Sequence, residues 1–202
     1  CLMIGGEDDI VAHLDPIFAT IAPGLGDIER TPGRTGAPTP EEQGYLHCGP
    51  PGAGHFVKMV HNGIEYGLMQ AYAEGYELLA ASELVHDVTG TLRAWTRGTV
   101  IRSWLLDLLV AAVDADPGLT EVDDYVEDSG EGRWTVDEAI DHAVPLPVIS
   151  AALFARFAPR QEPSPAMQAV APLRHQFGGH MVRQATHPKE PVPPRKPDPS
   201  EA

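Results

Sequence analysis

The chain has 202 residues, of which 43% are hydrophobic, so it is long enough to bury one substantial core. It carries 29 acidic and 14 basic residues, and the formal charge of -15 argues against nucleic acid as a partner, because phosphate contacts need clustered cations. No apolar run approaches the length that crosses a bilayer. The two cysteines, Cys1 and Cys48, are typical of a reducing cytoplasm rather than of a disulfide scaffold.

The first fifty residues predict a strand–helix–strand unit, which is the tail end of an open α/β sheet. Two strands alone are too few to be stable, and the chain opens on a strand already under way, so we expect a segment upstream to be missing. The expected segments are a strand at Cys1–Ile4, a helix from Ile10 to Ile21, a loop over 30–43 and a strand at Tyr45–Cys48.

The remainder of the chain predicts helices almost throughout. Gly63 and Gly67 lie one turn apart in the first of them and would let another helix approach closely. Residues 186–202 are rich in proline and charge, and we expect them to be disordered. The expected helices are Gly54 to about Leu78, one around Leu92–Arg97 capped by Asp87 or Thr89, a core helix over Val100–Val113, one beginning at Thr135 or Asp137, and two over Val148–Phe157 and Met167–His175.

The helix that begins near Gly54 carries the polar groups that predict chemistry. Lys58, His61, Asn62 and Glu65 fall within an arc of about 100°, so a base, an imidazole, an amide and an acid point into one space. Apolar residues cover much of the remaining surface, so we expect this helix to be buried. Buried titratable groups on one face are costly unless they meet a partner or a ligand. On spacing alone, a lysine that snorkels to solvent and a glutamate that pairs within the helix are the simpler interpretation.

Five segments, taken in chain order, carry a family resemblance over roughly residues 1–185. They are Cys1–Gly6, Gly54–Tyr66, Thr99–Ser103, Gly130–Thr135 and Arg174–His180. Cys1–Gly6 resembles the strand after the catalytic serine–glycine–glycine turn of the decarboxylating 6-phosphogluconate dehydrogenases, and Gly54–Tyr66 resembles their catalytic helix. Thr99–Ser103 resembles their phosphate-binding arginine segment. Gly130–Thr135 resembles their Gly-Thr-Gly-Lys-Trp-Thr turn, and Arg174–His180 resembles their Arg-x-x-Phe-Gly-x-His tail. The compact helical region resembles the short-chain subtype of that family.

The resemblance implies a mainly α fold in three parts. Residues 1–49 would be a βαβ remnant of a Rossmann-type coenzyme domain, 50–185 the all-helical substrate-binding and dimerisation domain, and 186–202 the disordered tail. No GxGxxG follows a strand. We therefore expect no coenzyme site in this chain, and no activity unless another chain supplies the missing domain.

The implied reaction is the oxidative decarboxylation of 6-phospho-D-gluconate by NADP or NAD, which yields ribulose 5-phosphate and carbon dioxide in the pentose phosphate pathway. The resemblance also implies a cytoplasmic protein that is at least a homodimer and needs no metal. A separate chain that binds the coenzyme would be a further partner. Lys58 would take the proton from the 3-hydroxyl group, and Glu65 would protonate carbon 1 of the enediol. The implied substrate contacts are His61, Asn62, Tyr66 near the phosphate, Arg102 at the phosphate, and Arg174 and His180 reaching the substrate of a neighbouring subunit.

One departure from the family pattern affects the phosphate. Ser129 and Glu131 stand where many members have a phosphate-binding lysine and a threonine, and Glu131 would repel a phosphate if it pointed inward.

Two other functions stay open. The chain could be a catalytically silent dimerisation or substrate-binding module. It could also be another β-hydroxyacid dehydrogenase, since those relatives share the spacing of Lys58 and Asn62, although Glu65 argues against a non-decarboxylating reaction.

Overall fold

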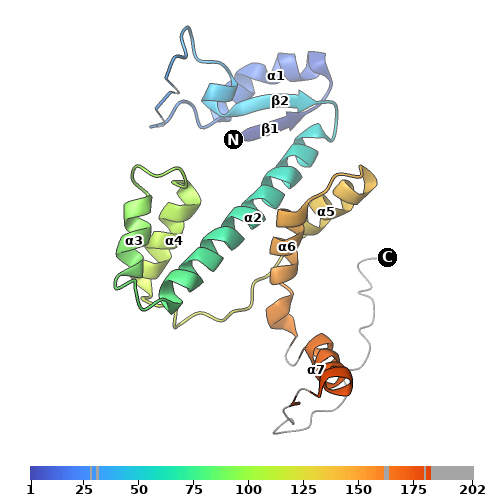
Figure 1. The fold of residues 1–202 in the computed structure, drawn as a ribbon. Coiled ribbons are helices and arrows are strands. Elements are labelled where there is room, and N and C mark those ends of the chain that lie inside the picture. The colour runs from blue at the N-terminus through green and yellow to red at the C-terminus, as the bar shows by residue number, and fades with distance from the viewer. Residues whose placement is uncertain (28, 31, 162–163, 180, 183–202) are drawn as a thin grey trace. The chain divides into compact units, whose positions relative to one another are not determined.

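The computed structural model describes residues 1–27, 29–30, 32–161, 164–179 and 181–182. It forms two compact units, Cys1–Arg160 and Gln161–Ala202. Within the described ranges the first unit holds one two-stranded parallel sheet and six α-helices, and the second holds the helix α7 (Pro165–Gly178) (Figure 1). The predicted mainly α fold with a βαβ segment at its start is confirmed. The expected tail over 186–202 lies outside the described residues.

The βαβ segment is built as its hydrophobic pattern predicts. Strand β1 (Leu2–Gly5) pairs in parallel with β2 (Tyr45–Gly49), and Leu2 lies opposite Tyr45. The helix α1 (Asp8–Ile21) connects them and packs on one face of the pair, with Val11 buried against the strands. A short 3₁₀ turn, η1, precedes β2.

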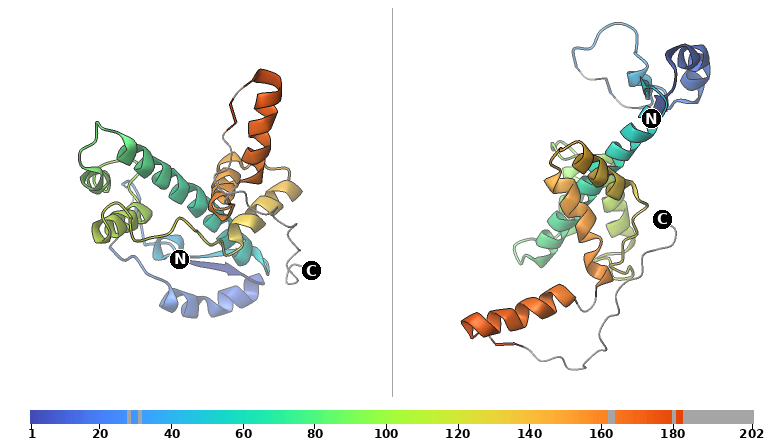
Figure 2. Two further views of the ribbon diagram at one scale, coloured as in Figure 1. Left: turned by 90° about the horizontal axis from the view of Figure 1, so that it is seen from below. Right: turned by 90° about the vertical axis from the view of Figure 1, so that its right-hand side faces the viewer.

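Helix α2 (Ala53–Ala81) is the element on which the others assemble. Its 29 residues span about 43 Å, and it contacts both strands and the helices α3, α4, α5 and α6. Figures 1 and 2 show the sheet at its N-terminal end and the α3–α4 pair beside its C-terminal half. Within the described residues, no helix is both long and apolar enough to cross a membrane.

The buried positions of α2 are mostly glycines. Gly63 faces the side chain of Thr135 and Gly67 faces Val148, so the predicted close approach of other helices is confirmed. The prediction that the whole helix is buried is wrong for this chain. Phe56 is 43% exposed and Ile64 is 53% exposed.

The helices α3 (Val88–Trp95) and α4 (Trp104–Ala115) share a core that includes Leu92 and Leu106. Asp87 caps α3 through its Oδ1, which accepts the backbone N–H of Gly90 at 2.7 Å. Helix α4 begins at Trp104 rather than at Val100. The hydroxyl of Ser103 accepts the backbone N–H of Leu106 at 3.1 Å and so fixes the start of the helix there.

The helices α5 (Glu131–Asp141) and α6 (Pro147–Ala155) pack on the side of α2 that carries its glycines. Helix α5 begins at Glu131, four residues before the predicted Thr135. Gly130 has a left-handed φ of 102° that only glycine adopts readily, and this turn brings the chain into the helix earlier. The carboxylate of Glu131 in the first turn is also favourable there.

Candidate functional site

The predicted catalytic face of α2 forms a connected set of polar side chains. The ammonium group of Lys58 donates to Oδ1 of Asn62. Nδ1 of His61 lies 3.1 Å from the same oxygen and 3.9 Å from a carboxylate oxygen of Glu65. The structure therefore brings together four residues that the sequence pattern placed on one face. Their side chains are open to solvent to differing degrees, with His61 at 54% and Glu65 at 37%.

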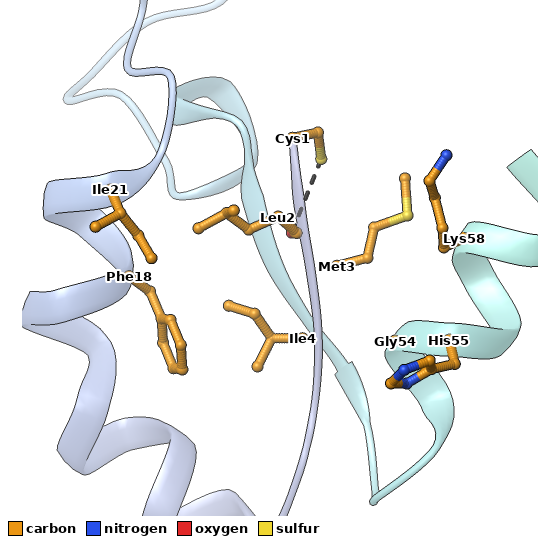
Figure 3. A pocket seen from close by; sticks show the side chains of 9 residues that line it. All are labelled: Cys1, Leu2, Met3, Ile4, Phe18, Ile21, Gly54, His55 and Lys58. Carbon is orange, nitrogen blue, oxygen red and sulfur yellow. Dashed lines mark hydrogen bonds between the residues drawn. The ribbon is translucent and has the colours of Figure 1, made fainter.

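The first turns of α2 are fixed against β1 by backbone contact. A Cβ at Gly54 would lie 2.3 Å from the carbonyl oxygen of Met3, so only glycine fits at this crossing. Figure 3 shows Leu2 and Ile4 pointing toward α1, whereas Met3 points to the opposite side, toward Lys58. A pocket of about 390 Å³ lies here, and Lys58 and His55 are part of its lining.

A second pocket of about 610 Å³ lies between α2 and α5, and Lys58 borders it as well. The hydroxyl of Thr135 donates to the carbonyl oxygens of Met59 at 3.0 Å and of Glu131 at 2.7 Å, which holds the start of α5 against the catalytic turns of α2. The residues that line this pocket are Gly52, His55, Phe56, Lys58 and Met59 of the α2 region and Glu131, Trp134, Asp137, Glu138 and Asp141 of α5.

The carboxylate of Glu131 points into this second pocket. The hydroxyl of Ser129 donates to Oε2 of Glu131 and is the largest cause of the lowered pKa of that carboxyl. The backbone N–H of Glu131, the ammonium of Lys58 and the amide of Asn62 lower the pKa further, and burial opposes them. The inward orientation that the sequence analysis considered for Glu131 is therefore the one observed, and the residue is ionised at neutral pH.

Tyr66 lies one helical turn beyond Asn62 and is 5% exposed. Its hydroxyl has no hydrogen-bond partner among the described residues. The guanidinium carbon of Arg156 stacks over the ring at 3.4 Å from its centroid, and a Cβ at Gly132 would lie 2.6 Å from Cε1 of the ring. The hydroxyl is therefore a buried, unsatisfied polar group, and neither Tyr66 nor Arg156 lines either of the two pockets.

Sequence reasoning did not identify Arg156. A signal was available, because no acidic residue lies within four positions of it, so its local sequence offers the charge no partner. In the structure the guanidinium donates to the carbonyl oxygen of Glu127 at 3.2 Å and otherwise faces Tyr66.

Arg102 does not join this cluster. Arg102 is exposed rather than buried, and its segment is tied to Tyr72, whose hydroxyl donates to the carbonyl oxygen of Ile101 at 2.7 Å. Tyr72 lies fourteen residues beyond Lys58, which is about 21 Å along α2. The chain therefore does not bring its own Arg102 to its own Lys58. Arg174 is exposed on α7 of the second unit, and His180 lies outside the described residues.

No three histidine, cysteine or carboxylate side chains in the part of the chain that the structure describes are grouped as metal ligands would be. The two pockets, by contrast, meet at Lys58. One is largely apolar and adjoins the strands, and the other carries the carboxylates of α5. The amine at this junction is hydrogen-bonded to an amide, with an imidazole and a carboxylate beside it, and such a set is suited to moving protons on a polar ligand.

Comparison with known proteins identifies the family of this chain. The profile of the 6-phosphogluconate dehydrogenase C-terminal domain matches residues 54–188. A Bacillus subtilis homologue of 6-phosphogluconate dehydrogenase, YqeC, is 38% identical over 91% of this chain and 56% of its own length. The NAD(+)-dependent decarboxylating enzyme of Haloferax volcanii is 40% identical over 90% of this chain and 55% of its own length. An NADP(+)-dependent decarboxylating enzyme of Bacillus subtilis is 41% identical over 77% of this chain.

The matches place the chain in a family of oxidoreductases, and the names of the relatives include enzymes dependent on NAD(+) or NADP(+). More particularly, the chain belongs to the 6-phosphogluconate dehydrogenase family, and its matched part is the C-terminal domain. This membership favours that family over the other β-hydroxyacid dehydrogenases. The chain spans little more than half the length of the first two relatives.

Proposed function

We propose that this chain provides the substrate-binding half of a site for the oxidative decarboxylation of 6-phospho-D-gluconate to ribulose 5-phosphate and carbon dioxide. The observation that carries the proposal is the connected set Lys58, Asn62, His61 and Glu65, whose lysine borders two pockets. The names of the relatives support it, since two of them are decarboxylating enzymes that use NAD or NADP.

The described residues do not by themselves form a dinucleotide site. The pocket beside β1 has a volume of about 390 Å³ and is largely apolar, and no glycine-rich phosphate loop follows β1. NAD or NADP would supply the hydride acceptor, and residues other than the described ones would have to hold most of it. We therefore derive only the proton transfers that this chain can perform.

Lys58 takes the proton from the 3-hydroxyl group as carbon 3 is oxidised. The amine of Lys58 must be neutral for this step. Because water and the hydrogen bond to Asn62 favour the charged ammonium, the bound substrate has to displace both. Loss of carbon dioxide from the resulting 3-keto acid leaves an enediol, and Glu65 gives the proton that carbon 1 needs. His61 and Asn62 lie between the two groups and can orient the intervening hydroxyls.

The phosphate of the substrate is assigned to Tyr66 and Arg156. The buried hydroxyl would donate to a phosphate oxygen once substrate binding opens the side chains around it, and the guanidinium over the ring would supply positive charge. Arg102, Arg174 and His180 stay predictions. The 21 Å separation along α2 means that Arg102 could serve only a site to which another copy contributes Lys58.

A homodimer and a cytoplasmic location are part of the same proposal. The apolar side chains that this chain leaves open on α2 and α4, such as Ile64 and Trp104, support association with another copy or domain. Size-exclusion chromatography with light scattering should give at least twice the monomer mass, and a monomer at micromolar concentration would contradict it.

The proposed function is tested by mixing the chain with the coenzyme-binding half of the Haloferax volcanii relative and following coenzyme reduction with 6-phosphogluconate. Formation of reduced coenzyme and ribulose 5-phosphate is expected, and the Lys58→Met variant is the control.

The alternative, a catalytically silent module, is favoured by one observation, the exposure of the catalytic side chains in this chain. Binding of 6-phosphogluconate by calorimetry with no turnover in the mixture would favour that alternative.

A further inference from the structure

The amide of Asn62 lies between an ammonium group and a carboxylate. Its Oδ1 accepts a hydrogen bond from Lys58 and lies 3.1 Å from Nδ1 of His61. Its nitrogen is left for the carboxylate of Glu131, whose ionised form this amide stabilises by a hydrogen bond. An ionised carboxylate only accepts hydrogen bonds and an ammonium group only donates them, so each neighbour selects one end of the amide. The opposite orientation would place donor against donor and acceptor against acceptor.

The turn that carries Glu131 is fixed from the side that precedes it. The hydroxyl of Ser129 donates to Oε2 of Glu131. The side chain of Asp128 is 5% exposed and accepts hydrogen bonds from Arg133 at 2.7 Å and from Arg160 at 3.0 Å. The carboxylate of Glu131 therefore follows directly on a residue that two guanidinium groups hold in place.

The same turn is fixed against α2 from the side that follows it. Oγ1 of Thr135 lies 2.7 Å from the carbonyl oxygen of Glu131 and 3.0 Å from that of Met59, the residue after Lys58. Thr135 is 4% exposed, so this contact is buried. The spacing between Glu131 and the helix turn that carries the amine is thus set by packing as well as by polar contacts.

We propose that Glu131 is a positioning residue for the amine of Lys58: its carboxylate holds the amide nitrogen of Asn62, which turns the amide oxygen toward the amine. This inference rests on the proposed function and deepens it, because Lys58 is the base in that proposal. Once the amine moves to a substrate hydroxyl, the same amide oxygen is free to accept a hydrogen bond from a second hydroxyl of the sugar acid.

The first measurement uses the isolated chain. Asn62 is the only asparagine in the sequence, so ¹⁵N labelling of asparagine side chains gives a single NH₂ signal by NMR. A hydrogen bond to an ionised acceptor shifts an equilibrium by roughly tenfold, so Glu131→Ala should raise the rate at which this NH₂ group exchanges its protons with water by about tenfold. Glu131→Gln keeps an acceptor oxygen, and because neutral hydrogen bonds are roughly half as strong, an increase of about threefold is expected there.

Glu138→Ala is the matched control. Glu138 lines the same pocket on the same helix, and its carboxylate lies 3.5 Å from Nε2 of His142. The substitution removes the same charge and the same side chain, and we expect it to change the exchange rate of Asn62 by less than twofold. An unchanged rate in both Glu131 variants would overturn the inference. So would equal increases in Glu131→Ala and Glu138→Ala, because the effect would then be one of net charge alone.

Turnover in the mixture with a coenzyme-binding half separates this inference from the proposed function. Glu131→Ala should lower kcat by about tenfold without raising KM for 6-phosphogluconate, since one oriented hydrogen bond is lost. Turnover by the unaltered chain with an unchanged Asn62 signal in Glu131→Ala refutes the role of Glu131 and leaves the function standing. Faster exchange in Glu131→Ala with no turnover by any chain refutes the function and leaves the contact standing. Faster exchange with an unchanged kcat overturns the inference, because the contact would then not position the base.

Discussion

Replacing Gly63 by alanine should weaken the attachment of α5 to the catalytic turns of α2. The added Cβ would lie 2.8 Å from Cγ2 and 3.0 Å from Oγ1 of Thr135, which is buried and cannot turn away without losing its hydrogen bond to Met59. Alanine is preferred over glycine in a helix by about 1 kcal/mol. Overpacking of this kind costs about 1–3 kcal/mol. The expected result is a net loss of about 1 kcal/mol in the free energy of unfolding.

Gly75 provides the control within the same helix, because a Cβ there would meet nothing within 4 Å. Gly75→Ala should therefore stabilise the protein by about 1 kcal/mol, so that the two substitutions differ by about 2 kcal/mol. Adding Thr135→Ser to Gly63→Ala removes the clashing methyl group, keeps the hydroxyl, and should recover most of the loss. Urea unfolding followed by far-ultraviolet circular dichroism measures all three. If Gly63→Ala stabilises as much as Gly75→Ala, the close packing of α2 and α5 is refuted.

Three further predictions concern single side chains. In the mixture with a coenzyme-binding domain, Lys58→Met should abolish coenzyme reduction while calorimetry still detects 6-phosphogluconate binding; near-normal rates would reject Lys58 as the base. Arg156→Ala should weaken 6-phosphogluconate by at least tenfold more than gluconate, since a charge-assisted hydrogen bond contributes about 1.5–3 kcal/mol, whereas a larger selective loss in Arg102→Ala would move the phosphate site to Arg102. The carboxyl of Asp128 accepts a hydrogen bond from Arg133, and this bond is the main cause of its pKa being lowered from 3.8. The ionised carboxylate stabilises the fold at pH values above its ordinary pKa, and this contribution is lost as pH falls through the lower pKa of the folded state. Asp128→Asn should therefore cost about 1–2 kcal/mol near neutral pH and much less in acid, and a pH-independent difference between the two unfolding curves would contradict the pairing.

Much of the fold follows from local patterns in the chain. The apolar period predicts the strand–helix–strand start and the long α2, and the one-turn spacing of Gly63 and Gly67 predicts the approach of α5 and α6. The spacing of Lys58, Asn62 and Glu65 places them on one face because it depends only on helix geometry. Where a boundary depends on a cap, as at Ser103, the apolar run alone extends the helix too far.

The parts that the sequence does not predict depend on tertiary contact. Arg156 meets Tyr66 across ninety residues of chain, and no local pattern encodes that meeting. Val100 and Trp104, on either side of Arg102, show the opposite case, since an apolar run favours burial and yet both are exposed in this chain. Ile64 is likewise apolar and exposed, and the proposed association with another copy would cover it.

The crossing of β1 over the start of α2 has a mechanical consequence. Gly5 and Gly54 meet backbone to backbone, and a Cβ on either would lie within 3.0 Å of the other segment. There is no side-chain layer between them that could deform and absorb a displacement. A displacement of β1 is therefore passed directly to the turn of α2 that carries Lys58. A domain that binds the sheet would thereby also move the ammonium group of this residue.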